Sequence, residues 1–115
     1  MSEFSLAVVT SALDGLAARQ RIIAANIANS ETPGYLAKRV NFEDSLRSAI
    51  GARDISQYGG VSTAQTTDAT LPNGNNVQLD AETVNLTETN LKYQLMTDAV
   101  NNEFHILHTS MRRDS

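Results

Sequence analysis

Apolar residues recur every three or four positions through the first thirty residues of the chain. The spacing alternates between three and four, the a and d pattern of a heptad repeat, with one polar break at Gln20. The positions of this first seam are Leu6, Val9, Leu13, Leu16, Ile23 and Ile27. Ser2 is a suitable N-cap, and Glu3 lies in the first turn, where the helix dipole favours a carboxylate. We predict an amphipathic helix over residues 2–31, on the order of 40 Å long at about 1.5 Å per residue.

A second seam of the same kind occupies the last third of the chain. Its positions are Leu86, Tyr93, Met96, Val100, Phe104 and Leu107, with Leu91 and Leu95 widening the apolar stripe on one flank. Asp80 is a suitable N-cap, and Arg112 and Arg113 suit the negative end of a helix dipole. We predict a second long helix that begins at Asp80.

The first helix runs into the sequence TPGY at residues 32–35, which is a strong stop signal. A residue that precedes proline is driven out of the α region, and glycine reaches backbone angles that other residues avoid. We therefore predict a sharp elbow, at which the chain leaves the helix and becomes extended. A short helix is expected next, with Asn41 as its N-cap and Gly51 as its C-terminal stop.

The middle of the chain changes character. Residues 52–76 are rich in Gly, Ser, Thr, Asn and Asp, with isolated apolar residues between turn signals. We predict a flexible or weakly extended segment there, with a short strand near Val61. The chain then divides into a long helix with its elbow (1–35), a short helix with a polar middle segment (36–76) and a second long helix (77–115). The predicted fold is mainly α, with the N- and C-terminal helices paired as a coiled coil and an irregular, flexible middle segment.

Composition narrows the function classes. The 115 residues carry a net charge of −4, which argues against a nucleic-acid reader, since such proteins present a basic face. The absence of cysteine rules out a disulfide framework and a thiolate metal site. No run approaches the roughly 20 apolar residues of a membrane span, and the first residues lack the basic region of a cleavable secretory signal.

Catalytic and metal-binding chemistry finds little support in the sequence. His105 and His108 lie three residues apart and can share a helix face, but a metal site needs a third ligand. There is no nucleophile elbow and no glycine-rich loop between a strand and a helix. We expect solvated or partner-facing histidines, no cofactor, no small-molecule substrate and no enzymatic activity.

The apolar seams are more informative, because a two-helix hairpin covers only one face of each helix. Small domains need a larger core than such a hairpin supplies. We therefore expect other chains to complete the seams. Two classes remain open on this reasoning: a self-assembling structural subunit, or a cytoplasmic helical adaptor or export chaperone that binds a client helix.

Asn26 and Asn29 are unusual so close to the end of the first helix, because asparagine is a mediocre helix former. One interpretation is that the helix frays before the proline. The other is that the two amides hydrogen-bond to the loop backbone or to a neighbouring subunit. Their spacing does not decide between these interpretations.

These residues also carry a resemblance. The pattern Ala-Asn-x-Ala-Asn followed by Thr-Pro-Gly-Tyr resembles the N-terminal signature of bacterial flagellar rod and hook proteins. Its positions in this sequence are Ala25, Asn26, Asn29, Thr32, Pro33, Gly34 and Tyr35. The segment Val40–Glu43 with Leu46 resembles the proximal rod branch of that family, and residues 75–104 are similar to its closing helix. The short middle segment lacks the large outer domain of hook and distal rod proteins.

The resemblance implies a structural subunit of the basal-body rod, which transmits torque from the membrane ring to the hook. It implies assembly with itself and other rod proteins, with the adaptor FliE and the ring protein FliF as neighbours. It also implies a location in the rod within the periplasmic space. Export would use the flagellar type III apparatus, without a cleavable signal. The motif residues Asn26, Asn29, Thr32, Pro33, Gly34 and Tyr35 are then expected to serve assembly.

Overall fold

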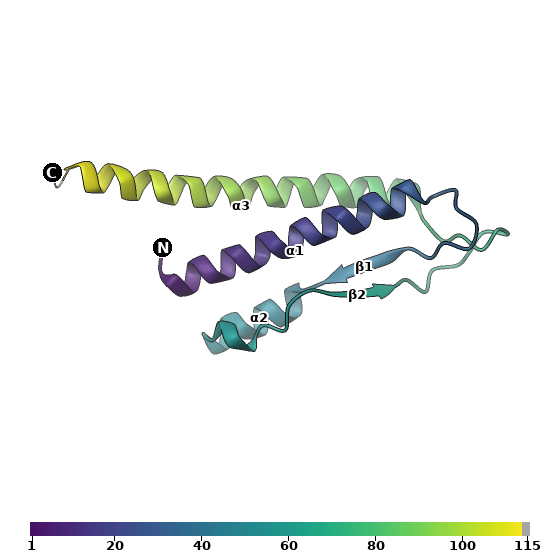
Figure 1. Cartoon of the computed structure of the whole chain (residues 1–115), viewed down its shortest axis with the longest axis horizontal. Helices are drawn as coiled ribbons and strands as arrows, with labels where there is room; N and C mark the ends of the chain where they lie inside the picture. The colour runs from purple at the N-terminus through teal and green to yellow at the C-terminus, as the bar shows by residue number, and fades with distance from the viewer. Residues whose placement is uncertain (114–115) are drawn as a thin grey trace.

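The computed structural model describes residues 1–113 and shows an elongated helical hairpin with a smaller arm beside it (Figure 1). The molecule measures 68 × 27 × 14 Å. In chain order the elements are α1 (Glu3–Ala28), β1 (Lys38–Asn41), α2 (Glu43–Ala52), the 3-10 helix η1 (Ile55–Gln57), β2 (Ser62–Gln65) and α3 (Leu79–Arg113). The mainly α fold, with long terminal helices packed together, is confirmed.

Helix α1 begins where the sequence predicts. The Oγ atom of Ser2 accepts a hydrogen bond from the backbone N–H of Ser5 at 3.0 Å, so Ser2 is its N-cap. The helix ends at Ala28, three residues before the predicted end, and Asn29 is the C-cap. Residues 29–34 then form the turns of the elbow.

Helix α3 is longer than α1, with 35 residues against 26, or about 52 Å against about 39 Å. The two run antiparallel, and Gln20 Nε2 donates to Asn90 Oδ1 at 2.6 Å in the half of each helix nearer the elbow. The amino group of Met1 pairs with Glu103, so residues 104–113 of α3 continue past the start of α1 (Figure 1). We call residues 104–113 the overhang. The predicted cap Asp80 is wrong, because the helix already includes Leu79.

The arm contains a two-stranded antiparallel sheet, in which Lys38 lies opposite Gln65 and Asn41 opposite Ser62. Strand β2 lies next to Val61, as predicted, but the sequence did not predict β1. The predicted cap Asn41 is wrong, because it is the last residue of β1 and Phe42 takes the cap position without a side-chain bond. Gly51 does not stop α2, which ends one residue later in front of Arg53, at φ 54°.

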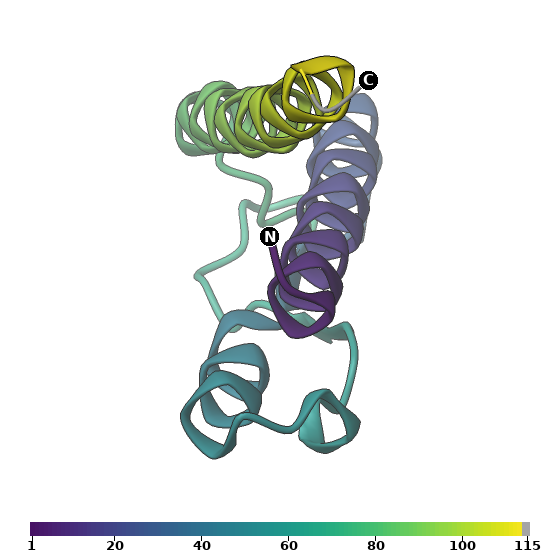
Figure 2. The ribbon, with the colours of Figure 1, turned by 90° about the vertical axis from the view of Figure 1, so that its left-hand side faces the viewer.

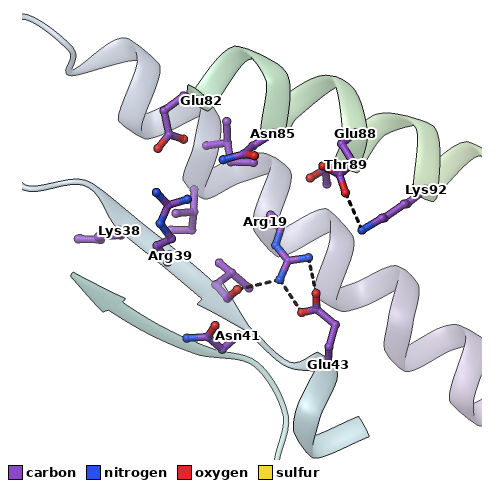
Figure 3. Close-up of a pocket in the computed structure, with 13 residues that line it drawn as sticks. Arg19, Lys38, Arg39, Asn41, Glu43, Glu82, Asn85, Glu88, Thr89 and Lys92 are labelled. Atoms are coloured by element: carbon purple, nitrogen blue, oxygen red, sulfur yellow. Dashed lines mark hydrogen bonds and ion pairs between the residues drawn. The ribbon is translucent and has the colours of Figure 1, made fainter. Parts of the chain in front are cut away.

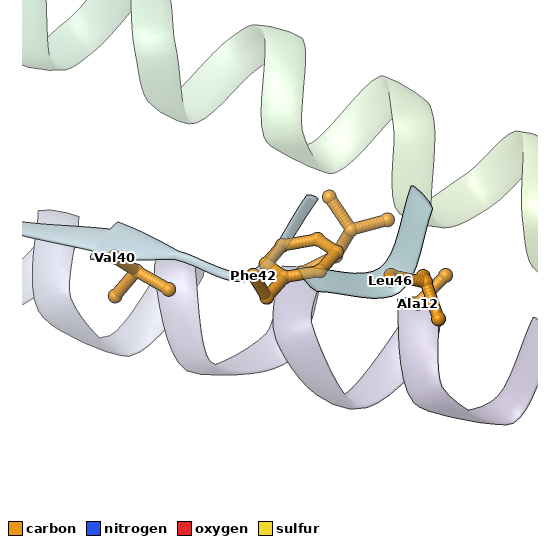
Figure 4. Close-up of a cluster of buried hydrophobic side chains, with 5 residues drawn as sticks. Ala12, Val40, Phe42 and Leu46 are labelled. Carbon is orange, nitrogen blue, oxygen red and sulfur yellow. The ribbon is translucent and has the colours of Figure 1, made fainter. Parts of the chain in front are cut away.

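The core lies where α1, β1 and α2 meet, and Phe42 is its centre (Figure 4). The buried residues around Phe42 are Ala12, Leu16, Val40 and Leu46. The Phe42 ring lies directly on Gly15, since a Cβ atom there would come within 2.6 Å of ring carbons. The Arg19 guanidinium lies over the ring, 5.0 Å from its centre. Figure 2 shows the result, with α1 between α3 and α2.

The seams are closed toward the elbow and open at the other end. Leu16 and Ile23 are buried, whereas Leu6 is 40% exposed. The half-buried seam residues are Val9, Leu13, Ile27, Leu86, Tyr93, Met96 and Val100. Phe104 and Leu107 lie on the overhang and are each 55% exposed. Within residues 1–113, no helix combines the length and hydropathy of a membrane span.

Candidate functional site: the elbow and its clasp

Asn26 lies at the junction of α1, β1 and α3, and its side chain is fully buried. Its Nδ2 donates to the carbonyl of Lys38 at 2.9 Å and to Glu82 Oε2 at 3.2 Å. Its Oδ1 accepts from the Lys38 N–H at 3.0 Å and from the Tyr35 hydroxyl at 3.3 Å. Of the two interpretations left open by the sequence, Asn26 follows the second, because its amide binds loop and strand backbone.

Asn29 behaves differently. Its Nδ2 donates to the Ala25 carbonyl, one turn back in the same helix, at 2.8 Å. Its Oδ1 accepts from the Thr32 hydroxyl at 3.1 Å. Asn29 therefore shapes the exit from α1 locally, while Asn26 joins α1 to other elements. Thr32 and Pro33 are exposed on the outside of the elbow.

The loop before α3 closes over the elbow through Asn75, whose side chain is fully buried. Its Nδ2 donates to the carbonyls of Asn29 and Thr32, each at 2.8 Å. These carbonyls lie in the turns beyond the end of α1, where they also accept backbone bonds from the Thr32 and Tyr35 N–H groups at 3.0 and 3.2 Å. The Asn75 Oδ1 accepts from the Val77 N–H at 2.7 Å. One side chain thus joins the end of α1 to the approach to α3.

Asn76 extends the same loop contact toward the sheet. Its Oδ1 accepts from the Ala37 N–H at 2.7 Å, and its own N–H donates to the Tyr35 carbonyl at 3.2 Å. Its Nδ2 donates to Thr66 Oγ1 at 3.0 Å and to the Asp68 carbonyl at 3.2 Å. Asn76 is 3% exposed, so these bonds form away from water.

Two glycines permit the close approach of elbow and loop. Gly34 and Gly74 have φ angles of 75° and 83°, in the left-handed region that favours glycine. The Gly34 N–H donates to the Asn73 carbonyl at 2.9 Å. A Cβ atom on Gly74 would lie 3.2 Å from Gly34 Cα, so the two backbones are in contact. We call the loop residues 73–76 the clasp, because they bind the elbow on both sides.

A polar pocket of about 300 Å³ lies beside this junction, between β1 and the first turns of α3 (Figure 3). Glu82 lines it and is 2% exposed, with the bond from Asn26 as its side-chain partner. Arg19 crosses the other end of the pocket, donating to the Val40 carbonyl at 2.8 Å and to both carboxylate oxygens of Glu43. Charged and amide side chains from α1, β1 and α3 therefore line this pocket together.

The ion pair between Arg19 and Glu43 also sets the protonation of Glu43. Burial alone would raise the pKa of this carboxyl group. The hydrogen bond and the positive charge of Arg19 together outweigh burial and leave the pKa of Glu43 below its ordinary value. Glu43 therefore stays ionised and keeps α2 tied to α1 until the solution becomes acidic.

The overhang is the other feature of functional interest. His105 and His108 are both exposed there, and no group of three His, Asp or Glu residues within 1–113 is placed to hold a metal ion. Phe104, Leu107 and Met111 are 55%, 55% and 64% exposed. Exposed apolar side chains gathered at one end of a helix are typical of a surface that other chains cover.

Sequence reasoning missed much of the elbow's inner contact. The sequence places Asn75 and Asn76 at the end of the polar middle segment and Glu82 in the second helix, and it predicts no inner contact for any of them. Their partners between Asn26 and Ala37 lie 39 to 56 residues away along the chain, and no local sequence pattern indicates such contacts. One sequence feature could have indicated these contacts, namely the run of asparagines at the Pro-Asn-Gly turn. Asparagine side chains that become buried need hydrogen-bond partners, and backbone groups are the usual ones.

Comparison with known proteins agrees with this architecture. A family model described as flagella basal body rod protein matches residues 6–35, which cover most of α1 and the elbow up to Tyr35. With the helical hairpin, this match defines the class of protein, a structural subunit of the bacterial flagellar rod.

Relatives cover from about three quarters to nearly all of the chain. The flagellar basal body rod protein FlgB of Bacillus subtilis is 30% identical over 95% of each chain. FlgB of Salmonella typhimurium is 32% identical over 73% of this chain and 75% of its own, and FlgB of Borreliella burgdorferi is 31% identical over 75% and 79%. The chain belongs to the FlgB family of flagellar basal body rod proteins. A client-binding adaptor is correspondingly disfavoured.

Proposed function

We propose that this protein is a self-assembling subunit of the proximal rod and that its terminal helices transmit torque from the membrane ring toward the hook. The observation that carries the proposal is the seam of α1 and α3, which is closed by the clasp at one end and open at Phe104 and Leu107 at the other. A part that transmits torque needs stiff elements and broad interfaces between subunits.

The clasp supports the stiffness that this role requires. Its buried Asn75 amide donates hydrogen bonds that connect the end of α1 to the loop before α3. The two helices are therefore held together at the elbow by hydrogen bonds as well as by the connecting backbone. Burial of the exposed seam between subunits would then contribute roughly 25 cal/mol per Å² of apolar area. The motif residues Asn26, Asn29, Thr32, Pro33, Gly34 and Tyr35 serve assembly in this proposal, by fixing the elbow.

The proposed neighbours follow from the family. They are other rod proteins, the adaptor FliE, the ring protein FliF and, before assembly, the flagellar type III export apparatus. The proposed location is the rod within the periplasmic space, reached without a cleavable signal. Family membership supports flagellar basal-body location in general.

Deletion of the gene is the direct test. Cells without the protein should not swim, and their basal bodies should have rings without rods, with both defects restored by the wild-type gene. Purified basal bodies from complemented cells should contain the protein. Normal swimming in the deletion strain would refute a structural role, and absence from basal bodies would favour a cytoplasmic adaptor instead.

The assembly role of the elbow has its own test. The double variant Pro33→Ala, Gly34→Ala removes the stop signal and places a Cβ atom on a residue at φ 75°. We expect soluble, helical protein that does not enter the rod. The matched control is Gly51→Ala, a glycine within α2 with open space around it. Normal incorporation of the double variant would show that the elbow is dispensable for assembly.

A further inference from the structure

The overhang continues the covered face of α3 beyond the end of α1. Phe104, Leu107 and Met111 follow Val100 at steps of four, three and four, so they lie on the side of α3 that earlier packs on α1. Because Met1 pairs with Glu103, α1 reaches only the start of the overhang, and Phe104 and Leu107 stay 55% exposed. A groove of about 380 Å³ opens here, lined by Met1, Leu6, Val100, Phe104 and Leu107 among others.

The charge along α3 changes sign at the same place. Residues 79–103 contain five carboxylates and one lysine. Residues 104–113 contain two arginines and two histidines and no carboxylate, with Asp114 the next residue in the sequence. The overhang is therefore a cationic, apolar segment at the end of an acidic helix, and its partner should be apolar and acidic.

Helix α3 itself carries such a surface on its opposite side. Val84, Leu91 and Leu95 are spaced by seven and four residues and thus share one face, and they are 64%, 59% and 59% exposed. At about 100° per residue, this face lies roughly opposite Tyr93, which packs against the core. We call it the outer stripe. Glu88 and Asp98 lie at its two margins, and Glu88 and Leu95 are on the margin that also lines the pockets toward β1 and α2. In Figure 1, α3 has no other element above it.

We propose that the overhang of one copy packs on the outer stripe of a second copy. Apolar side chains then meet apolar side chains, and the cationic end of one α3 meets the acidic part of the other. Two different surfaces form the contact, so it is heterologous and can repeat from copy to copy without closing as a two-fold dimer. The proposal rests on the self-assembly proposed above and names the surfaces that perform it.

Such a contact should be weak in isolation. The overhang has ten residues, about 15 Å of helix, and interfaces below about 1,000 Å² are usually transient. The contact gains strength when other contacts already hold the copies together, because its effective concentration then rises. A test should therefore trap neighbours in the assembled state.

The chain contains no cysteine, so introduced cysteines report contacts cleanly. The test variant combines Leu107→Cys and Leu91→Cys in the full-length chain, expressed in cells that build flagella. The two positions are 16 residues apart on one helix, about 24 Å, which is beyond the Cα separation of roughly 7 Å that a disulfide allows. Any disulfide between them must therefore join two chains. We expect oxidation of purified basal bodies to give cross-linked dimers and higher multimers.

Controls separate this contact from others. Each single variant should give about tenfold less cross-linked product, because in the proposed contact a cysteine meets only the other position. The pair Leu107→Cys with Val61→Cys should behave like the singles, although Val61 is 41% exposed. Within the test pair, Glu88→Lys should lower the yield severalfold and Lys92→Glu should not. Both changes break the same Glu88–Lys92 ion pair, which spans 3.0 Å within α3.

The outcomes decide the proposal. Basal bodies that contain the test variant but give no more product than the singles would overturn it and leave the rod function intact. Dimers from Leu107→Cys alone would overturn it in favour of a symmetric contact between overhangs. If the protein is missing from basal bodies, the rod function fails, and oxidation of the concentrated purified chain still decides whether overhang and outer stripe meet.

Discussion

Replacing Asn26 by alanine should destabilise the protein by about 3.5–5 kcal/mol, although alanine is the better helix former. The two bonds to the Lys38 backbone contribute about 1 kcal/mol each, and the bond to the Glu82 carboxylate about 1.5–3 kcal/mol. The longer bond from Tyr35 adds roughly 0.5 kcal/mol, and the gain in helix propensity offsets about as much. The loss is a large part of the roughly 5–15 kcal/mol that stabilises a typical domain.

Asn29→Ala is the matched control, since it is the same change in the same motif. Among residues 1–113, the Asn29 side chain bonds only to Ala25 and Thr32. The bond from Asn75 reaches the Asn29 backbone carbonyl, which the substitution leaves in place. We expect a loss of about 1 kcal/mol there. Urea unfolding followed by helical circular dichroism measures both. With a slope of about 1–3 kcal/mol per molar urea, Asn26→Ala should lower the midpoint by roughly 1–5 M.

The comparison can fail in a clear way. If Asn26→Ala and Asn29→Ala differ by less than about 1 kcal/mol at equal slope, the buried amide does not hold the junction as its geometry indicates. Asn26→Asp sharpens the test, because it keeps the shape but replaces the Nδ2 donor by an oxygen facing Glu82 and the Lys38 carbonyl. At neutral pH, Asn26→Asp should be at least as unstable as Asn26→Ala. Acidification should bring the free energies of unfolding of these two variants closer together, because it neutralises the new carboxylate.

Three further variants test other contacts. Gly15→Ala should cost about 1–3 kcal/mol in urea unfolding, since the new Cβ atom would lie 2.6 Å from the Phe42 ring; an increase in stability would mean that helix propensity outweighs this contact. Tyr58→Phe should be neutral or stabilising in thermal unfolding, because the buried Tyr58 hydroxyl has no hydrogen-bond partner within residues 1–113, and a clear loss would contradict that geometry. Glu43→Gln should lower stability at neutral pH but not in acid. The lowered folded-state pKa of Glu43 means that its contribution is present above the unfolded pKa and is lost as pH falls through the folded pKa. An equal difference from wild type at pH 7 and pH 3 would contradict the role assigned to Arg19.

The sequence predicted the elements whose causes are local. Both long helices follow from the heptad seams, the start of α1 from Ser2, and the elbow from Pro33 and Gly34. Strand β1 is not predicted from the sequence, because only one of its four residues, KRVN, is a buried apolar residue, which gives no alternating pattern. Its hydrogen-bond partners are also distant in the sequence. The start of α3 was placed one residue late, since Asp80 is a good cap and still lies inside the helix.

The inner contacts of the elbow are of a different kind. Asn26 was singled out by its awkward position in a helix, but its partners Lys38 and Glu82 come from two other elements. Gly15 gave no signal, because only the packing of Phe42 explains it. The assembly role of the motif residues, the seams as interfaces and the division at residues 35 and 76 stay predictions, which the cross-linking and deletion experiments address.

Side chains of helix α1 form hydrogen bonds with the edge of strand β1 that faces away from β2. On the side away from β2, the N–H and carbonyl of Lys38 bind the amide of Asn26, and the Val40 carbonyl binds Arg19. These side chains take the place of a third strand. An open strand edge invites pairing with any neighbour, a hazard that grows when many copies are held side by side. By closing this edge from within the chain, α1 leaves the copies free to meet through their helices, and mispairing through β1 is blocked.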